Sequence, residues 1–326
     1  MTSRPSLLSE KQISKASSST AVPVGYTRGP FGYFGSKQRL AQQIARILPP
    51  HNAWVEAFCS SAAVTMAKKA APIEIINDAD YQIVNVFRQL REHAMELCRL
   101  IDLTPYARGE FEKAQKINAT ADKLEQARRF LVASMMTVNG AIGNNGNGVK
   151  RSGFSYSQAY ARNGQEARVN RWNGLPDRLR KVVDRLKHVR IESRDARELL
   201  KMFINRPATL VYLDPPYLMD RDYRYKVDAN EKEFHEELLS LCCRAKCMVL
   251  ISSYDNPLYR SFLTRERGWK RIAIKTYTRD TKGNDYSRTE VLWQNRHFVR
   301  AVVTGRVPIR LTEKEKANHK VNPARR

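Results

Sequence analysis

The sequence is poor in cysteine and in acidic residues, and it has no long apolar run. Its five cysteines are odd in number, and they lack the repeated C-x-x-C spacing with nearby histidines that is typical of zinc sites. They are Cys59, Cys98, Cys242, Cys243 and Cys247. We therefore expect neither a disulfide framework nor a metal site, and we expect reduced thiols that pack as small apolar groups.

No run of about 18 apolar residues is present, and no signal-type apolar segment follows the start. We therefore expect a soluble, intracellular protein without a membrane span. Acidic residues number 33 against 57 lysines and arginines, so the formal net charge is +24 and the pI is near 10.0. A surface of this kind attracts polyanions, which makes nucleic acid the leading expected partner. No required protein partner is evident.

The 326 residues, 42% of them hydrophobic, suffice for one core with a smaller inserted subdomain. Residues 1–25 and 307–326 lack apolar periodicity, and we expect them to be tails, the second one basic. Between them, β-branched or aromatic runs alternate with amphipathic stretches, which predicts an α/β fold of the doubly wound, Rossmann-like type with helices on both faces of a sheet. The expected strands are Trp54–Phe58, Glu74–Asn77, Val189–Glu192, Leu210–Leu213, Met248–Ser252, Arg271–Tyr277 and Val291–Gln294.

Some helices are recognisable because their apolar residues share one face. One face holds Leu40, Ile44, Ile47 and Leu48, with Ser36 as the candidate N-cap, and another holds Leu179, Val182, Val183 and Leu186. Cys243 and Cys247 are expected four residues apart on a further helix.

The strand signals vanish from about residue 91 to residue 187, where the sequence is helical and charged. This region contains an Asn/Gly-rich stretch at residues 139–148, and its glycines predict a loop. The loop is either a solvent-exposed connector or a contact to nucleic acid. We predict a helical subdomain at 91–187 that is inserted into a domain formed by 26–90 and 188–306.

The most specific signal is a buried strand that ends in Asp214, Pro215, Pro216 and Tyr217. The prolines fix the turn, which falls at the carboxyl end of a strand, where open α/β sheets bind ligands. The Asp214 carboxylate and the Pro215 carbonyl offer two acceptors, and the Tyr217 ring offers a stacking surface. This set suits an amino group on a flat ring, whose lone pair is then directed toward an electrophile without a metal.

These residues resemble the catalytic motif of amino-methyltransferases, and the surrounding blocks resemble the Dam-type adenine-N6 DNA methyltransferases, in particular their phage-like branch. The blocks follow in the family's order over most of residues 31–295. They are Tyr33–Lys37, Val55–Val64, Asn77–Asp80, Glu192–Ala196, His235–Leu239 and Ser252–Tyr259. The resemblance implies transfer of a methyl group from S-adenosylmethionine to the N6 amino group of adenine in DNA.

The resemblance also implies which residues contact S-adenosylmethionine. They are Tyr33, Lys37, Phe58, Asp78, Asp195 and Asp214. Asp78 suits the two ribose hydroxyls of the adenosine, although Asn-Asp is also an ordinary turn. Asp195 suits the adenine amino group, and its alternative is a helix N-cap. Lys37 suits the methionine carboxylate or a DNA phosphate, and its alternative is a solvated lysine.

One loop departs from the family, because Ala57, Ser60 and Ala62 stand where the family has Pro, Gly and Gly. Glycines there let the backbone approach the cofactor closely, so this departure motivates the alternative of a non-catalytic DNA-binding protein that keeps the fold. Two more alternatives are transfer to cytosine N4, which uses the same two acceptors, and a structural packaging protein.

A target base inside double-stranded DNA has to flip out of the helix to reach such a site. Phosphate contacts are expected from a basic group at the end of the helical region and from a second group near the C-terminus. The first is Arg168, Arg171, Arg178, Arg180, Lys181, Arg185, Lys187 and Arg190, and the second is Arg279, Lys282, Arg288 and the tail. We expect base-reading residues between Asn139 and Tyr156. The resemblance suggests a bacterial or phage-infected cytoplasm, and restriction-modification is among the roles expected.

Overall fold

The computed structural model describes residues 27–33, 35–116, 121–138, 153–157, 161–162, 164–218, 231–279 and 285–308. The expected tail at 1–25 and the Asn/Gly-rich stretch at 139–148 lie outside the described residues, as do Lys282 and all but two residues of the tail at 307–326. Across the part of the chain that is described, no helix is long and apolar enough to cross a membrane.

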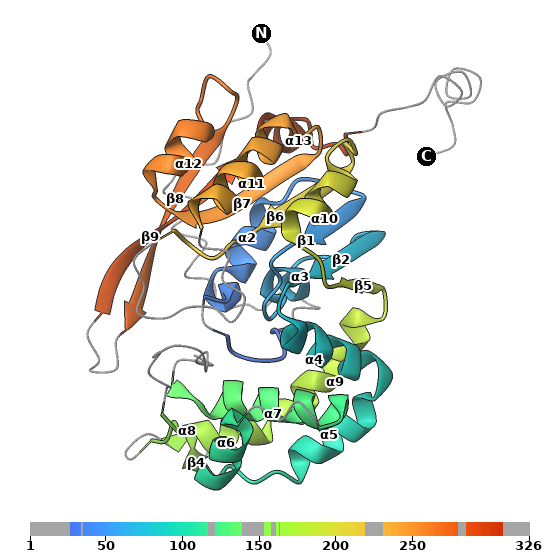
Figure 1. Cartoon of the computed structure of the whole chain (residues 1–326), viewed down its shortest axis with the longest axis vertical. Helices are drawn as coiled ribbons and strands as arrows, with labels where there is room; N and C mark the ends of the chain where they lie inside the picture. The colour runs from blue at the N-terminus through green and yellow to red at the C-terminus, as the bar shows by residue number, and fades with distance from the viewer. Residues whose placement is uncertain are drawn as a thin grey trace, which may run out of the picture.

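A seven-stranded sheet in the order β5-β2-β1-β6-β7-β9-β8 lies in the upper part of the molecule as drawn in Figure 1. Its strands are β1 (Ala53–Glu56), β2 (Ile73–Asn77), β5 (Val189–Glu192), β6 (Thr209–Leu213), β7 (Met248–Tyr254), β8 (Lys270–Arg279) and β9 (Asp285–Gln294). The first five are parallel, and β9 is antiparallel to both β7 and β8. Each expected strand is confirmed: β5 has the predicted bounds, the ends of the others shift by one or two residues, and β9 begins six residues earlier than predicted.

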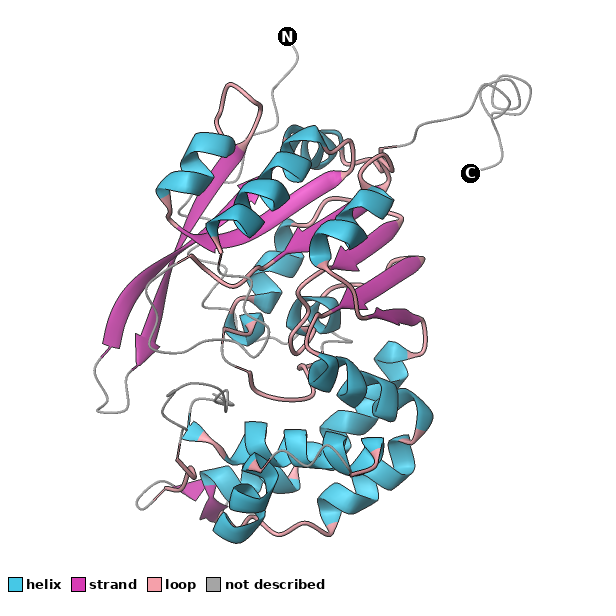
Figure 2. Ribbon diagram, in the orientation of Figure 1, coloured by secondary structure: helices cyan, strands magenta, loops and turns pink. Residues whose placement is uncertain are grey.

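Helices cover both faces of the sheet (Figure 2), as predicted. One face packs on α10 (Ala196–Phe203), α11 (Lys232–Arg244) and α12 (Pro257–Phe262), and the other on α2 (Ala41–Ile47), α3 (Ala63–Ala67) and α13 (Arg296–Thr304). Successive residues of one strand enter opposite layers: Val211 and Leu213 of β6 face the first set of helices, and Leu210 and Tyr212 face the second. The Rossmann-like α/β fold is therefore confirmed.

A group of helices follows β2 and precedes β5 in the chain. It consists of α4 (Tyr81–Glu92), α5 (Ala94–Asp102), α6 (Arg108–Gln115), α7 (Lys123–Met136), α8 (Ala167–Asn173) and α9 (Leu175–Leu186), with the short strands β3 (Ala161–Arg162) and β4 (Gln165–Glu166). The β3-β4 pair was not predicted, because two-residue strands carry no periodic signal. The predicted boundary between residues 90 and 91 falls inside α4, and the division into two domains stays a prediction.

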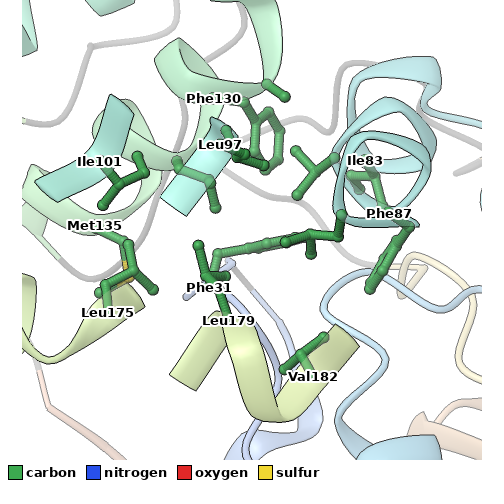
Figure 3. Close-up of a cluster of buried hydrophobic side chains, with 14 of the residues drawn as sticks. Phe31, Ile83, Phe87, Leu97, Ile101, Phe130, Met135, Leu175, Leu179 and Val182 are labelled. Carbon is green, nitrogen blue, oxygen red and sulfur yellow. The ribbon is translucent and has the colours of Figure 1, made fainter. Parts of the chain in front are cut away.

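Phe31, close before the expected cofactor block, is buried among these helices (Figure 3). Its side chain is 1% exposed, and its ring meets Phe87 of α4 and Phe130 of α7 at centroid distances of 6.0 and 5.0 Å. The same apolar cluster takes in Leu179 and Val182 on the predicted face of α9. The segment that leads to Lys37 is thus anchored in the helical group rather than in the sheet.

Two local predictions are wrong. Ser36 precedes a 3-10 turn, η2 (Lys37–Arg39), and its side chain makes no capping hydrogen bond; α2 begins after Leu40 instead. Cys247 is not on a helix with Cys243, because α11 ends at Arg244, where the chain turns into β7. Ser36 lies just before one helical element and Cys247 just beyond another, and sequence patterns locate such boundaries least well.

The order in which the chain forms the strands indicates where a ligand site is expected. From β1 it passes outward to β2 and β5 on one side, and then crosses back to β6 and β7 on the other. The carboxyl ends of β1 and β6 are therefore neighbours at the point where the strand order reverses, and such a point is where open α/β sheets bind ligands.

Candidate active site

The turn after β6 brings Asp214 and Tyr217 together with Lys37 from the start of η2. The Lys37 Nζ lies 2.7 Å from Asp214 Oδ1, and the two side chains are only 8% and 12% exposed. The Tyr217 hydroxyl oxygen lies 3.1 Å from the same oxygen, and the Lys37 Nζ stands 4.9 Å from the Tyr217 ring centroid. Lys37 and the turn from Asp214 to Tyr217, which the sequence predicted separately, thus form one cluster.

Glu290 on β9 belongs to this cluster and was not predicted. It accepts a short hydrogen bond from the Tyr217 hydroxyl, and its Oε1 lies 3.6 Å from the Lys37 Nζ. Its strand register places it opposite Tyr254 of β7, whose ring meets that of Tyr217 at a centroid distance of 4.4 Å. The only sequence signal was an acid directly before Val291, at the start of an apolar strand segment.

The electrostatics of the cluster follow from two buried carboxylates that share one ammonium. Burial raises the pKa of Asp214, and Lys37 opposes that shift by attracting the ionised form. Burial also raises the pKa of Glu290, with Lys37 opposing and Asp214 adding to the shift. Burial beside these carboxylates raises the pKa of Tyr217 well above its ordinary value, so its hydroxyl stays a donor at neutral pH.

Asp78 lies at the end of β2 and holds the neighbouring loop through main-chain contacts. Its Oδ2 accepts from the Ser60 N–H at 2.8 Å, and its Oδ1 accepts from the Asp80 N–H at 2.9 Å. Burial raises its pKa to about 6, so the carboxylate is mainly ionised at neutral pH. Each oxygen keeps lone-pair capacity beyond its N–H partner, as a site for ribose hydroxyls requires.

Asn77 joins three strand ends and was not singled out from the sequence. Its buried amide donates to the Ala57 carbonyl at 2.9 Å and to the Arg194 carbonyl at 3.0 Å, and it accepts from the Arg194 N–H at 2.9 Å. Since Ala57 follows β1 and Arg194 follows β5, one side chain fixes the spacing of the ends of β1, β2 and β5.

The loop after β1 has a left-handed backbone at the two positions where the resembled family has glycine. Ser60 has φ 46° and Ala62 has φ 50°, and among the described residues they alone, apart from glycines, have positive φ. The loop therefore keeps a glycine-like path despite its side chains, at a cost of about 1–2 kcal/mol per residue. The departure from the family therefore carries a conformational cost at these two positions.

Glu56, at the end of β1, is a further buried acid beside the loop. Its Oε2 accepts from the Thr65 N–H at 2.9 Å and from the Thr65 hydroxyl. Burial raises its pKa to about 7, and the nearby charge of Asp214 adds to the shift. The carboxyl end of β1 thus carries a titratable group near neutral pH.

The remaining predicted cofactor residues contact other parts of the structure. Asp195 caps α10 by accepting from the Arg197 N–H at 2.7 Å, and it pairs with the Arg197 guanidinium at 2.6 Å. Tyr33 stacks on Phe130 of the helical group at a centroid distance of 6.3 Å. Phe58, after β1, packs edge-on against Phe234 of α11. Their contacts with S-adenosylmethionine stay predictions.

Comparisons with known proteins agree with this geometry. The sequence model described as D12 class N6 adenine-specific DNA methyltransferase matches residues 33–276, which is most of the chain. No curated protein matches.

Similar solved structures include a SAM-dependent methyltransferase from Agrobacterium tumefaciens, with 8% identity, a TM-score of 0.35, and coverage of 79% of this chain and 60% of that one. They also include an rRNA methyltransferase from Streptomyces viridochromogenes, with 13% identity, a TM-score of 0.33, and coverage of 88% and 95%. The chain thus spans less than two thirds of the length of the first structure. With both TM-scores below 0.5, the fold assignment rests on the strand order of the sheet itself.

Proposed function

This chain belongs to the family of D12 class N6 adenine-specific DNA methyltransferases, and from that membership we propose how its own residues transfer a methyl group from S-adenosylmethionine to the N6 amino group of adenine in DNA. The observation that carries the proposal is the fixed, buried Asp214 carboxylate at the point where the strand order reverses. S-adenosylmethionine supplies an electrophilic methyl group when it is bound.

Asp214 and Pro215 bind the target amino group, and Tyr217 supports the plane of the base. The carboxylate of Asp214 and the carbonyl of Pro215 accept the two N–H groups, which directs the nitrogen lone pair toward the methyl group. Positive charge that develops on the nitrogen is stabilised by the Asp214 carboxylate, whose buried position strengthens the interaction. Pro215 and Pro216 keep the acceptors fixed, so little reorganisation is required during the reaction.

Residues at the ends of β1 and β2 fit S-adenosylmethionine. Asp78 binds the ribose hydroxyls, because its carboxylate is held by two main-chain N–H groups and is mainly ionised at neutral pH. Ser60 and Ala62 in the neighbouring loop adopt the left-handed backbone that glycine most readily adopts. Phe58 contributes apolar surface beside this loop, and Asp195 contributes an acceptor at the end of β5.

Arginines of the helical group supply the DNA contact. Several of the predicted basic residues are neutralised by acids: Arg180 by Asp177, Arg185 by Glu74, Lys187 by Asp184 and Arg190 by Glu192. In the part of the chain that is described, Arg168, Arg171 and Arg178 form no such ion pair.

Arg171 and Arg178 both reach the sulfur of Met135, at 3.8 and 3.6 Å. Burial and, to a smaller extent, the like charges of Arg171 and Arg28 together lower the pKa of Arg178 to about 10. An anion would relieve this repulsion, so these arginines are suited to DNA phosphates.

We further propose double-stranded DNA as the substrate form, with the target adenine flipped out of the helix. The helical region at 91–187 acts as an inserted unit that contacts the DNA, on the evidence of its unpaired arginines. The cytoplasm of a bacterial or phage-infected cell is the proposed location, because that is where such DNA is accessible to the enzyme.

The test is methyl transfer from labelled S-adenosylmethionine to unmodified genomic DNA, followed by digestion to nucleosides. We expect N6-methyladenine from the wild type and a loss of about 100-fold or more in Asp214→Asn, with DNA binding retained. Asp184→Asn, an exposed acid of α9, is the matched control and should behave as the wild type. Methylcytosine would identify cytosine N4 as the target instead, and an active Asp214→Asn would reject the assigned catalytic turn.

A further inference from the structure

The acceptor assigned to the target base is already engaged. Asp214 Oδ1 accepts from the Lys37 ammonium at 2.7 Å, and the Tyr217 hydroxyl oxygen lies 3.1 Å from it. An adenine amino group that binds this oxygen therefore competes with the ammonium, which also neutralises the charge of the carboxylate. Lys37 is 8% exposed, so its charge cannot simply move into water when the base arrives.

A second carboxylate lies within reach of the same ammonium. Glu290 Oε1 is 3.6 Å from the Lys37 Nζ, and it stays fixed by the hydrogen bond from Tyr217. The Gly35 carbonyl also accepts from Lys37 at 3.3 Å. The lysine side chain is flexible and its ammonium is a compact charge. A small rotation about the side-chain bonds of Lys37 therefore moves the ammonium from the Asp214 carboxylate to that of Glu290. Glu290 lies beyond residues 33–276, the part that the family model matches.

We propose that Glu290 is a positioning residue, which takes over the Lys37 ammonium when the target amino group binds Asp214. In the free enzyme Lys37 neutralises Asp214. In the complex Lys37 pairs with Glu290, and Asp214 is released for the base. The neutral amino group brings no charge of its own, so without Glu290 the buried ammonium would lose its counter-charge on base entry. The inference rests on the proposed role of Asp214.

The first test is Glu290→Gln, in which the amide oxygen still accepts from the Tyr217 hydroxyl but the negative charge is gone. We expect kcat with saturating DNA and donor to fall by about tenfold or more, because Lys37 remains on Asp214. The dissociation constant of S-adenosylmethionine should change by less than about twofold, which also shows that the variant is folded. Glu290→Asp keeps the charge and should retain most of the activity.

The second test is the pair Lys37→Met and Lys37→Met/Glu290→Gln. If Glu290 acts through Lys37, then removing the ammonium removes the need for Glu290, and the double variant loses no more activity than Lys37→Met alone. Losses that multiply would overturn the inference, and so would a Glu290→Gln enzyme with wild-type kcat. Tyr217→Phe tests the alternative that Glu290 only holds the Tyr217 ring in place. In that case Tyr217→Phe and Glu290→Gln should lose the same amount of activity, and neither loss should depend on Lys37.

Asp214→Asn, assayed in parallel, separates this inference from the assignment of the catalytic turn. An active Asp214→Asn enzyme would reject the turn itself. An inactive Asp214→Asn enzyme beside a fully active Glu290→Gln enzyme would reject only the transfer of Lys37.

Discussion

The turn after β6 and the loop after β1 reach the same edge of the sheet, but different interactions hold them. Charged side chains hold the turn, where Lys37 joins Asp214 and Glu290. Main-chain groups hold the loop, where Asp78 accepts from the Ser60 N–H and two residues adopt a left-handed backbone. We therefore expect charge substitutions and pH to act mainly on the proposed catalytic turn, Asp214–Tyr217. We expect changes of backbone freedom to act mainly on the loop after β1.

The largest expected effect is that of pH on the catalytic turn. Burial raises the pKa values of Asp214 and Glu290, so both take up protons at a higher pH than exposed carboxyls do. Protonated Asp214 neither attracts Lys37 nor stabilises charge on the target nitrogen. We expect kcat to fall about tenfold per pH unit below the apparent pKa, which should lie above the ordinary range of aspartate. The measurement is kcat against pH at saturating substrates.

A matching measurement of donor binding sharpens the comparison. Asp78 has a pKa of about 6, raised by burial, so donor affinity should weaken as the pH falls through 6. If kcat and donor affinity instead changed with the same apparent pKa, then Asp214 and Asp78 would not titrate independently of each other.

The next effect concerns Glu56, which lies under the loop and yet is influenced by Asp214. Its pKa is raised from 4.5 to about 7, so between those values the folded state binds a proton that the unfolded state has lost. The penalty for its buried charge is thus complete above pH 7 and disappears as the pH falls to 4.5. Glu56→Gln keeps an acceptor for Thr65 and removes the charge. We expect it to raise the free energy of unfolding by about 3 kcal/mol at pH 8.

Denaturant unfolding at pH 8 and pH 5 checks this expectation, because most of the gain should be lost at the lower pH. Glu192→Gln, on an exposed ion pair at the end of β5, is the control and should change stability little at either pH. A gain that is equal at both pH values would contradict the role assigned to the Glu56 charge.

Ser60→Gly tests the backbone side of the comparison. Ser60 has φ 46°, and its buried hydroxyl has no hydrogen-bond partner among the described residues. Glycine removes the cost of the left-handed backbone and the cost of the buried hydroxyl. It also increases the entropy of the unfolded chain, which offsets part of this gain, so we expect a net stabilisation of about 1 kcal/mol. Thermal unfolding measures it. Ala63→Gly, in the right-handed helix α3, should destabilise by about as much, and equal signs in the two variants would show that the left-handed backbone is not the cause.

The same comparison explains what the sequence could predict. The turn from Asp214 to Tyr217 was predictable because its chemistry lies in consecutive residues after a recognisable strand. Glu290 was not, because it meets Tyr217 only through the register of β9 on β7. The role of Asn77 was not predicted for a similar reason, since its hydrogen-bond partners follow β1 and β5, which are distant in the sequence. The positive φ of Ser60 was not predicted, because serine rarely adopts a left-handed backbone.

The smallest expected effect separates paired from unpaired basic residues of the helical group. Arg171 forms no ion pair within the described ranges, whereas Lys187 pairs with Asp184 at 2.8 Å. Arg171→Ala should weaken DNA binding at all sequences and reduce the slope of log affinity against log salt by about one. Lys187→Ala removes the same charge, but from a residue that already has a counter-ion, so its slope should change less. Equal slopes for the two variants would mean that the field of the whole +24 chain, rather than particular phosphate contacts, holds the DNA.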